Sequence, residues 1–492
     1  MSFGLLNVSR SGTYTQTTAP SEQTAALLFM RKLQESERHR TLLNYFAFYE
    51  GTHYSYLRDP AEPLITINYA QAFIDISNSF LFGNGFSFQS DDGEDSESPE
   101  LDALNQVWVD ADKDQFSLDM GTMGHVAGDV FVKITYVPET DKIVLVLLDT
   151  QTCFPIFSAY NREEFESFKI EYLINTGGAG DFNDVHLYTE IYKDDMIQVS
   201  WDGEISSQFP NPFPFIPIVH LKNKYNPRSY YGQSDLRDHI PLNKIFNEQT
   251  TKFQDIVNYH AEPVTIIYGA RMNNLTKGAR KVWSGLPATA RIENLQLQTD
   301  LPALQTFIDR LKTQMHEISG IPEHALGQEQ AVSNTSNAAL QTMYLPLINK
   351  TNQKRIYYGH GIKKINEYIL RIWQQVRGGV DPKVNDTTTI EWESPVPKDT
   401  ERVISQEIVP LMQMQLITRE HALKMIGIKN PKKMLDQVSK ELVEFSKIQG
   451  QIAENSAPPM ALPGGANGAQ QNPKEQSDSQ KEKQQLPGGE SK

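Results

Sequence analysis

The fold is decided by residues 301–319, which read LPALQTFIDRLKTQMHEIS. Apolar residues recur in this stretch at steps of three and four, which places them on one face of an α-helix. Asp300 is a plausible N-cap, Pro302 lies in the first turn, and Gly320 and Pro322 end the helix. The stretch therefore predicts an amphipathic helix with a single apolar stripe. The residues of that stripe are Leu304, Phe307, Ile308, Leu311, Met315 and Ile318.

Two further stretches predict long helices. One covers Asp238–Glu262 and ends at Pro263, and the other covers about Asn337–Arg377 and ends at Gly378-Gly379. At 1.5 Å per residue they measure roughly 37 Å and roughly 60 Å, and single compact domains seldom need helices of that length. Rods with one apolar stripe need neighbours, so the pattern predicts assembly rather than a ligand pocket. The stripe of the first rod contains Leu242, Ile245, Phe246, Phe253, Ile256 and Val257.

Residues between Val130 and about His220 have the composition of strands. Most connections between them are too short for a parallel crossover, so an antiparallel meander is expected. Helices are expected before it, over Ser21–Tyr49 and after an N-cap at Asn68. The chain is therefore predicted to belong to the α+β class. The expected strands are Val130–Val137, Ile143–Leu148, Phe168–Ile174, Val185–Tyr192 and Met196–Trp201.

The C-terminal part is expected to contain a strand, Thr387–Glu393, and then three short helices. Asn430-Pro431 supplies the N-cap and first residue of the last helix. Residues Asn455–Lys492 are rich in Pro, Gly, Gln and Ser and are predicted to be disordered. The last helix carries a near-heptad apolar stripe, made of Leu435, Val438, Leu442 and Phe445.

Composition limits the classes of protein that this chain can form. It has 492 residues, a formal net charge of -15 and a pI near 5.3. A cationic groove over most of the surface is therefore excluded, although a local basic patch is not. The single cysteine, Cys153, cannot form an intramolecular disulfide. No stretch approaches the length of a membrane span and none resembles a signal peptide. We expect a soluble protein made in the cytoplasm.

The sequence carries no recognisable catalytic pattern. The phosphate-binding loop of ATP-driven DNA motors does not occur in it. His316-Glu317 is the closest approach to a zinc-protease helix, but Gly320 stands where a second histidine is needed. The acidic run Asp91–Glu100 lacks the spacing of a calcium-binding loop and is expected to be a solvated surface loop. We predict no enzyme activity, no metal and no cofactor.

Two pairs of motifs stand at a characteristic separation. The first pair is Asn223-Lys224-Tyr225-Asn226 and Tyr231-Gly232-Gln233-Ser234-Asp235-Leu236. The second pair is Ile318-Ser319-Gly320-Ile321-Pro322 and Ser336-Asn337-Ala338-Ala339-Leu340. In this order and spacing they resemble the tailed-bacteriophage portal proteins of the class typified by the Bacillus phage SPP-one portal. The resemblance covers the chain from near residue 30 to near residue 450.

This resemblance implies a structural ring subunit rather than an enzyme. Members of the family form a dodecameric ring at one capsid vertex of the virion, through which double-stranded DNA is packaged and ejected without sequence specificity. The implied partners are further copies of the chain, the terminase large subunit, the head–tail adaptor protein, and capsid and scaffolding proteins, with no membrane and no cofactor.

The resemblance also implies a division of the chain into long stem and wing helices, an antiparallel β region in the wing, a small clip and a helical C-terminal crown. The implied regions are a flexible arm (1–20), the N-terminal wing (21–235), stem helix 1 (236–263), the clip (264–299), stem helix 2 (300–322), the tunnel loop (323–336), the long wing helix and strand (337–398), the crown (399–454) and a disordered tail (455–492).

Candidate contact residues follow from this division. The clip carries several cations and only Glu293 as an anion, a reversal of the chain's overall sign that favours an acidic partner or passing DNA. A solvated basic face is the alternative. Trp283 is an interface anchor or a packed hairpin residue. The residues expected to dock partners in the clip are Arg271, Lys277, Arg280, Lys281, Trp283 and Arg291.

The tunnel loop is rich in uncharged side chains that form hydrogen bonds. Such a loop can touch phosphates weakly and let DNA slide, although any flexible loop tends to be polar. The expected DNA-channel residues are Gln328, Gln330, Ser333, Asn334, Thr335 and Ser336. The residues expected to pack between subunits in the stem are Phe246, Phe253, Ile256, Leu304, Phe307, Leu311 and Met315.

Two other functions stay open from the sequence. Another ring of the virion, such as a connector or tail protein, would use similar helices without passing terminase-driven DNA. A DNA-processing enzyme is the more distant alternative, because the nucleotide-binding motif is missing.

Overall fold

The computed structural model describes residues 6–8, 14–16, 22–54, 64–90, 98–175, 185–261, 265–269, 289–294, 301–327, 337–382, 388–394, 404, 408–426, 428 and 431–455. The chain separates into two units, Met1–Pro397 and Lys398–Lys492. Helices and antiparallel strands are both abundant, which agrees with the α+β class predicted from the sequence.

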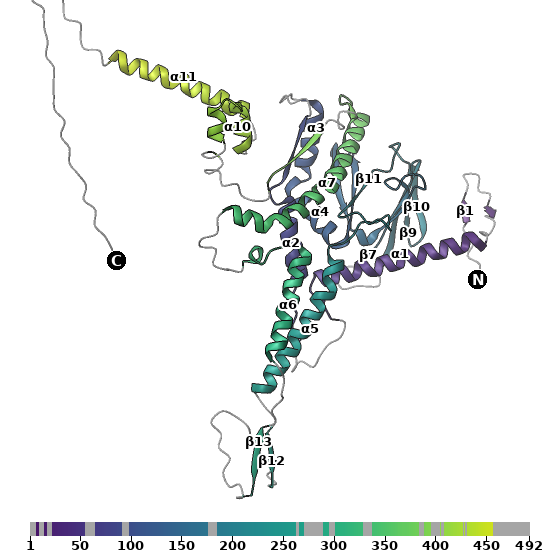
Figure 1. The fold of residues 1–492 in the computed structure, drawn as a ribbon. Helices are drawn as coiled ribbons and strands as arrows, with labels where there is room; N and C mark the ends of the chain where they lie inside the picture. Colours follow the sequence, from purple (N-terminus) through teal and green to yellow (C-terminus); the bar gives the residue numbers. More distant parts are fainter. Residues whose placement is uncertain are drawn as a thin grey trace, which may run out of the picture. The chain divides into compact units, whose positions relative to one another are not determined.

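Three long helices organise the first unit. α5 covers Leu236–Ala261, α6 covers Leu301–Ser319, and α7 covers 40 residues from Asn337 to Val376. The helices predicted for these stretches are confirmed to within two residues at each end. Figure 1 shows α5 and α6 side by side. Between them in the sequence, β12 (Thr265–Tyr268) pairs antiparallel with β13 (Arg291–Asn294).

The main core forms around α7. Three shorter helices pack in this part of the unit: α2 (Tyr69–Phe82), α3 (Pro99–Asp110) and α4 (Lys113–Ala127). Their apolar faces bury the fully covered side chain of Trp108, whose indole N–H donates to Asn366 Oδ1 of α7 at 2.8 Å. Because a buried indole needs such an acceptor, this bond fixes α3 against α7. α1 (Glu22–Tyr49) joins a separate small cluster with α2, α4 and α5.

Most strands of the first unit lie between Asp129 and Lys222 in the sequence. One sheet has the order β11-β4-β5, a second has the order β10-β9-β8-β7-β6, and β14 (Thr388–Trp392) pairs with β3 (Phe86–Ser90). All of these pairs are antiparallel, as the sequence predicted. The other bounds are β4 Asp129–Val137, β5 Lys142–Leu148, β6 Cys153–Phe157, β7 Phe165–Asn175, β8 Val185–Tyr192, β9 Met196–Trp201, β10 Glu204–Pro210 and β11 Ile218–Lys222.

Two strands of the five-stranded sheet were missed by the sequence prediction, and both lie at its edges. β6 contains Pro155 and β10 ends at Pro210. Proline is tolerated at a sheet edge because its missing N–H leaves no internal ladder bond unmade. β10 is exposed along its whole length, so it lacks the apolar alternation that marks a half-buried strand. Two short strands, β1 (Leu6–Val8) and β2 (Tyr14–Gln16), pair within the stretch predicted as an arm.

The second unit is helical in its described part. It contains α9 (Val409–Gln413), α10 (Arg419–Ile426) and α11 (Pro431–Asn455). The prediction of three short helices was wrong for the last one, which has 25 residues because its apolar pattern continues past Phe445. Apart from Asn455, the tail predicted to be disordered lies outside the described residues. No helix among the described residues is long and apolar enough to cross a membrane.

Two glycines of α7 offer a matched test of this packing. A Cβ on Gly361 would lie 2.4 Å from Leu221 Cγ, whereas a Cβ on Gly359 would meet Ile390 and Trp392 at 3.9 Å or more. We expect Gly361→Ala to destabilise the fold by about 1–3 kcal/mol through overpacking. Gly359→Ala is expected to stabilise it by about 0.5–1 kcal/mol through helix propensity. Urea denaturation followed by tryptophan fluorescence measures both, and equal effects would contradict the packing of α7 on β11.

Candidate functional site

The segment between β11 and α5 passes so close to α4 that only glycine fits. Gly128 ends α4 with φ +89°, and a Cβ on it would lie 2.6 Å from the backbone nitrogen of Ser234. A Cβ on Gly232 would overlap the carbonyl oxygen of Gly128. The Gly232 N–H also donates to Asp129 Oδ1 at 2.6 Å. The glycine of the Tyr231–Leu236 motif is therefore required by backbone contact.

Ser234 of the same motif connects α4 to α5. Its hydroxyl donates to the carbonyl of Val126 at 2.6 Å and accepts from the Leu236 N–H at 3.0 Å. The second bond satisfies one of the free N–H groups at the start of α5. The motif therefore sets where α5 begins and which part of α4 it meets.

Asp235 forms the centre of a buried charged cluster. Its carboxylate pairs closely with Lys354 of α7, and Lys350 Nζ lies 3.9 Å from its Oδ1. Burial opposes ionisation of Asp235, but Lys350, Lys354 and His125 hold its pKa well below its usual range. Burial lowers the pKa of Lys354 to about 8, against the attraction of Asp235. Both groups of the ion pair are therefore charged at neutral pH.

Two histidines near this cluster are neutral at physiological pH. Burial and the charge of Lys354 lower the pKa of His125 to about 3, and burial and Lys350 lower that of His239 to about 4. His125 Nδ1 lies 2.6 Å from the carbonyl of Gly121, and its Nε2 faces Asp235 Oδ2 at 3.9 Å. An uncharged imidazole thus lies between the carbonyl of Gly121 and the carboxylate of Asp235.

The second motif, Ile318–Pro322, meets the same turn of α7. Gly320 adopts φ +71° at the end of α6, and its nearest side chain is Pro346 of α7. Lys350 Nζ donates to the carbonyl of Ser319 at 3.3 Å. Lys350 and Lys354, one turn apart on α7, therefore join the end of α6 to the start of α5. We call Asp235, Lys350, Lys354 and the Ser319 carbonyl the helix junction.

The helix junction borders a cavity of about 170 Å³, lined among others by Asp235, His239, Ile318 and Lys350. The sequence did not single out its lysines. The only feature of the sequence that could have indicated Lys350 and Lys354 is their spacing, because residues four apart share a helix face. In the structure that face is directed at the carboxylate of Asp235.

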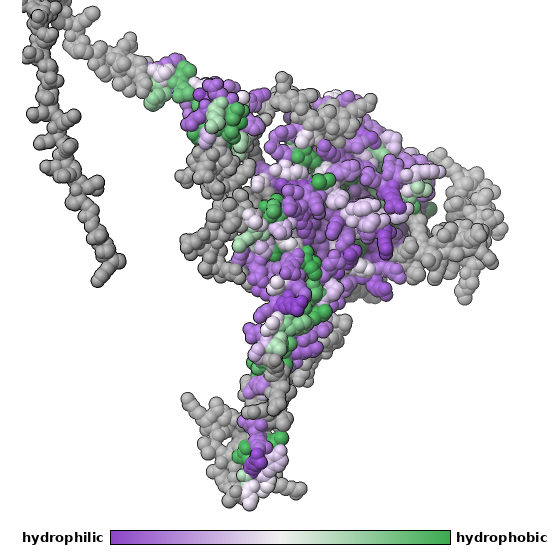
Figure 2. Space-filling view, viewed as in Figure 1, coloured by the Kyte–Doolittle hydropathy of each residue, from purple (hydrophilic) through white to green (hydrophobic). Residues whose placement is uncertain are grey.

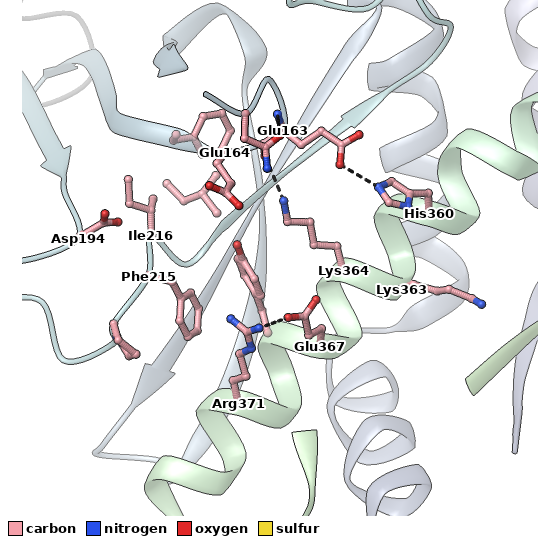
Figure 3. Close-up of a pocket in the computed structure, with 15 residues that line it drawn as sticks. Glu163, Glu164, Asp194, Phe215, Ile216, His360, Lys363, Lys364, Glu367 and Arg371 are labelled. Carbon is pink, nitrogen blue, oxygen red and sulfur yellow. Dashed lines mark hydrogen bonds and ion pairs between the residues drawn. The ribbon is translucent and has the colours of Figure 1, made fainter. Parts of the chain in front are cut away.

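A larger cleft of about 610 Å³ lies between α7 and the turns of the five-stranded sheet (Figure 3). Lys364 Nζ donates to the carbonyl of Glu163 at 3.0 Å, and His360 Nε2 lies 3.4 Å from Glu163 Oε2. Beside them the rings of Phe215 and Tyr368 pack with centroids 4.5 Å apart. These contacts cross from sheet to helix, so the cleft wall holds the sheet against α7.

The predicted DNA-channel residues lie outside the described part of the chain, and so do most of the predicted clip residues. Of the clip set, only Arg291 is described. It begins β13, its side chain is 75% exposed, and it pairs with Glu293. The charge of Arg291 is therefore partly neutralised by Glu293 in the same strand. The residues outside are Gln328, Gln330, Ser333, Asn334, Thr335, Ser336, Arg271, Lys277, Arg280, Lys281 and Trp283.

The residues expected to pack between stem subunits divide into two groups. Phe246, Leu311 and Met315 are buried within the chain itself, in a cluster with residues of α2 and α7. Their surface is already covered, so we correct the expectation for these three. A three- and four-residue repeat shows that a face is buried but does not show which chain buries it. Phe307 is 44% exposed, and the residues that are half-buried are Phe253, Ile256 and Leu304.

The ion pair of the helix junction can be tested by a double-mutant cycle. Asp235→Asn leaves the buried Lys354 without its closest counter-charge, which is expected to cost about 3–5 kcal/mol. Lys354→Met is expected to cost less, because Lys350 still faces Asp235. The double variant should be more stable than the sum of the single changes predicts, by about 1–3 kcal/mol. Urea denaturation measures each step, and additive effects would disprove the coupling.

His125 predicts a specific pH dependence. The pKa of His125 is about 3 in the folded chain and 6.5 in a free histidine. Below pH 6.5 the unfolded chain therefore binds a proton at this residue, whereas the folded chain does not. Stability must therefore fall as pH falls from 6.5 towards 3, by about 2 kcal/mol at pH 5 from this residue. We expect His125→Gln to lose about 2 kcal/mol less than the original chain between pH 7.5 and pH 5. Equal losses in urea denaturation would contradict the burial of a neutral imidazole.

Comparison with known proteins bears on this arrangement. The family model described as "Phage portal protein, SPP1 Gp6-like" matches residues 31–447, which is most of the chain and includes both motifs of the helix junction. No curated protein matches the chain. The resemblance inferred from the sequence is confirmed by the family match. The chain belongs to the family of SPP1 Gp6-like phage portal proteins, a structural rather than enzymatic family of the bacteriophage virion that serves genome packaging.

Proposed function

We propose that this chain is the subunit of a portal vertex. Copies of it form a ring, expected to be a dodecamer, around an axial channel at one vertex of the capsid. Double-stranded DNA enters the capsid through the channel during packaging and leaves through it during ejection. The observation that carries this proposal is the match of the portal family model over residues 31–447.

The surface of the helix pair supports assembly. Phe307 and Ile318 of α6 are 44% and 51% exposed, and eleven residues place them almost on one helix face. Ile245 and Val257 of α5 are also exposed. Figure 2 shows hydrophobic side chains at the surface of this pair. Exposed apolar patches of this kind mark surfaces that meet another protein, and in a ring that protein is the neighbouring copy.

The helix junction supports a stem made of α5 and α6. Asp235 and Lys350 fix the start of one helix and the end of the other to α7. A pair held at one end by buried charges projects as a unit from the rest of the subunit. We assign the stem to residues 236–263 and 300–322, and the wing to residues 21–235 and 337–398.

The regions at the two ends of the stem would meet the partners. We assign residues 264–299 to a clip that docks the terminase large subunit during packaging and the head–tail adaptor afterwards. Residues 323–336 would form the tunnel loop, and residues 399–454 the crown inside the capsid. The tunnel loop, which contains no lysine or arginine, would let DNA pass without the strong, salt-dependent grip of a lysine ring. The net charge of -15 supports the same outcome by repelling phosphates.

Electron microscopy of the purified chain in negative stain tests the proposal. We expect wheel-shaped particles with a central hole that bind the purified terminase large subunit. Rings that bind tail proteins but never terminase would favour a different connector. A chain that stays monomeric both alone and in the virion would contradict the portal function.

A substitution pair on α6 tests the role of its exposed stripe. Phe307→Asp is expected to abolish rings, because it places a charge on the apolar surface between copies. Thr306→Asp, on the adjoining exposed position of the same helix, should leave ring formation unchanged. Ring yield by size-exclusion chromatography measures both variants. Intact rings with Phe307→Asp would place the contact between stems elsewhere.

A further inference from the structure

α11 carries an apolar face that its own unit leaves uncovered. Met434, Val438, Leu442, Phe445 and Ile448 are between 40% and 61% exposed. They follow one another at steps of four, four, three and three, which places them on one side of the helix. Hydrophobic side chains of this helix lie at the surface in Figure 2. Glu441 falls within this face, but five exposed apolar side chains over four turns are still more apolar surface than a soluble helix leaves free without a partner.

The other described helices of the second unit are too short to cover this stripe. They are α9, with 5 residues, and α10, with 8. α10 contacts α11, and within the described part of α11 only Pro431, in the first turn, is fully buried. The partner of the stripe therefore lies outside the described helices of this unit.

The two flanks of the stripe differ in chemistry. At 100° per residue, Gln437 and Glu444 border it on one side, and Ser439 and Ser446 border it on the other. Each serine hydroxyl donates to the carbonyl three residues before it, at 2.8 Å. The serine flank is therefore small and already satisfied within its own helix, which allows a second helix to approach closely.

We propose that α11 packs against α11 of the two neighbouring subunits, so that these helices form a continuous collar. Three observations favour a second copy as the occupant. Steps of three and four residues are the pattern by which helices pack along one another. A ring, which is the part of the proposed function on which this inference depends, presents the same helix again in the same orientation. A closed ring also needs two different surfaces that meet, and the charged and small flanks supply them.

Cysteine cross-linking of the full-length ring tests the collar. Ser439→Cys with Glu444→Cys places one thiol on each flank. The natural Cys153 is buried, and burial raises the pKa of its thiol to about 12, so it should not react. We expect mild oxidation to give a ladder of covalent oligomers on a denaturing gel. The matched control, Asp436→Cys with Lys440→Cys, places both thiols on the far face and should give no ladder.

A second measurement avoids cysteine chemistry. Leu442→Glu with Phe445→Glu should lower the urea concentration at which rings dissociate, whereas Lys440→Glu with Lys447→Glu should leave it unchanged. Circular dichroism confirms that each variant keeps its helix content.

The outcomes separate this inference from the proposed function. Rings without a ladder, or with cross-links only inside one chain, would overturn the collar and leave the portal function standing. Absence of rings in the original chain would overturn both.

Discussion

The buried ion pair between Asp235 and Lys354 is the interaction on which the first unit depends. Isolated charges in a protein interior are costly, and they persist only where an opposite charge is held close. Here the carboxylate comes from the segment before α5 and the ammonium groups from the middle of α7. Because Lys350 also binds the end of α6, three helices that are distant in sequence have a fixed meeting point.

Close backbone contacts at three glycines also hold the first unit together. Gly128 and Gly232 bring two backbones together where no side chain fits, and Gly361 lets α7 lie against Leu221 of β11. Contacts of this kind allow little movement, since a shift of either partner would open a gap or cause an overlap. The part of the first unit that contains α4, β11 and α7 is therefore tightly packed, and α5 and α6 extend from it (Figure 1).

Periodicity predicted most of the helices, and it failed where the sequence carries no local signal. α6 was predicted with the bounds that the structure shows, because its stripe, first-turn proline and terminal glycine all agree. The edge strands β6 and β10 escaped detection because prolines and full exposure erase the alternation that reveals a strand. The helix junction also escaped, since pairing between Asp235 and Lys354 joins positions 119 residues apart. The stripe residues Phe246, Leu311 and Met315 were recognised as buried, but a pattern along one chain cannot tell an internal contact from one between copies.

Pro346 gives the subunit a preferred place to bend. A proline inside a helix has no N–H to donate to the carbonyl four residues earlier, so α7 lacks one rung there. Gly320, at the end of α6, lies directly beside this gap. After Pro346 come the lysines of the helix junction and Gly361, and before it come about two and a half turns of α7, which follow the predicted tunnel loop. A bend at Pro346 would therefore redirect residues 337–345 and leave the contacts of Asp235 with Lys350 and Lys354 intact.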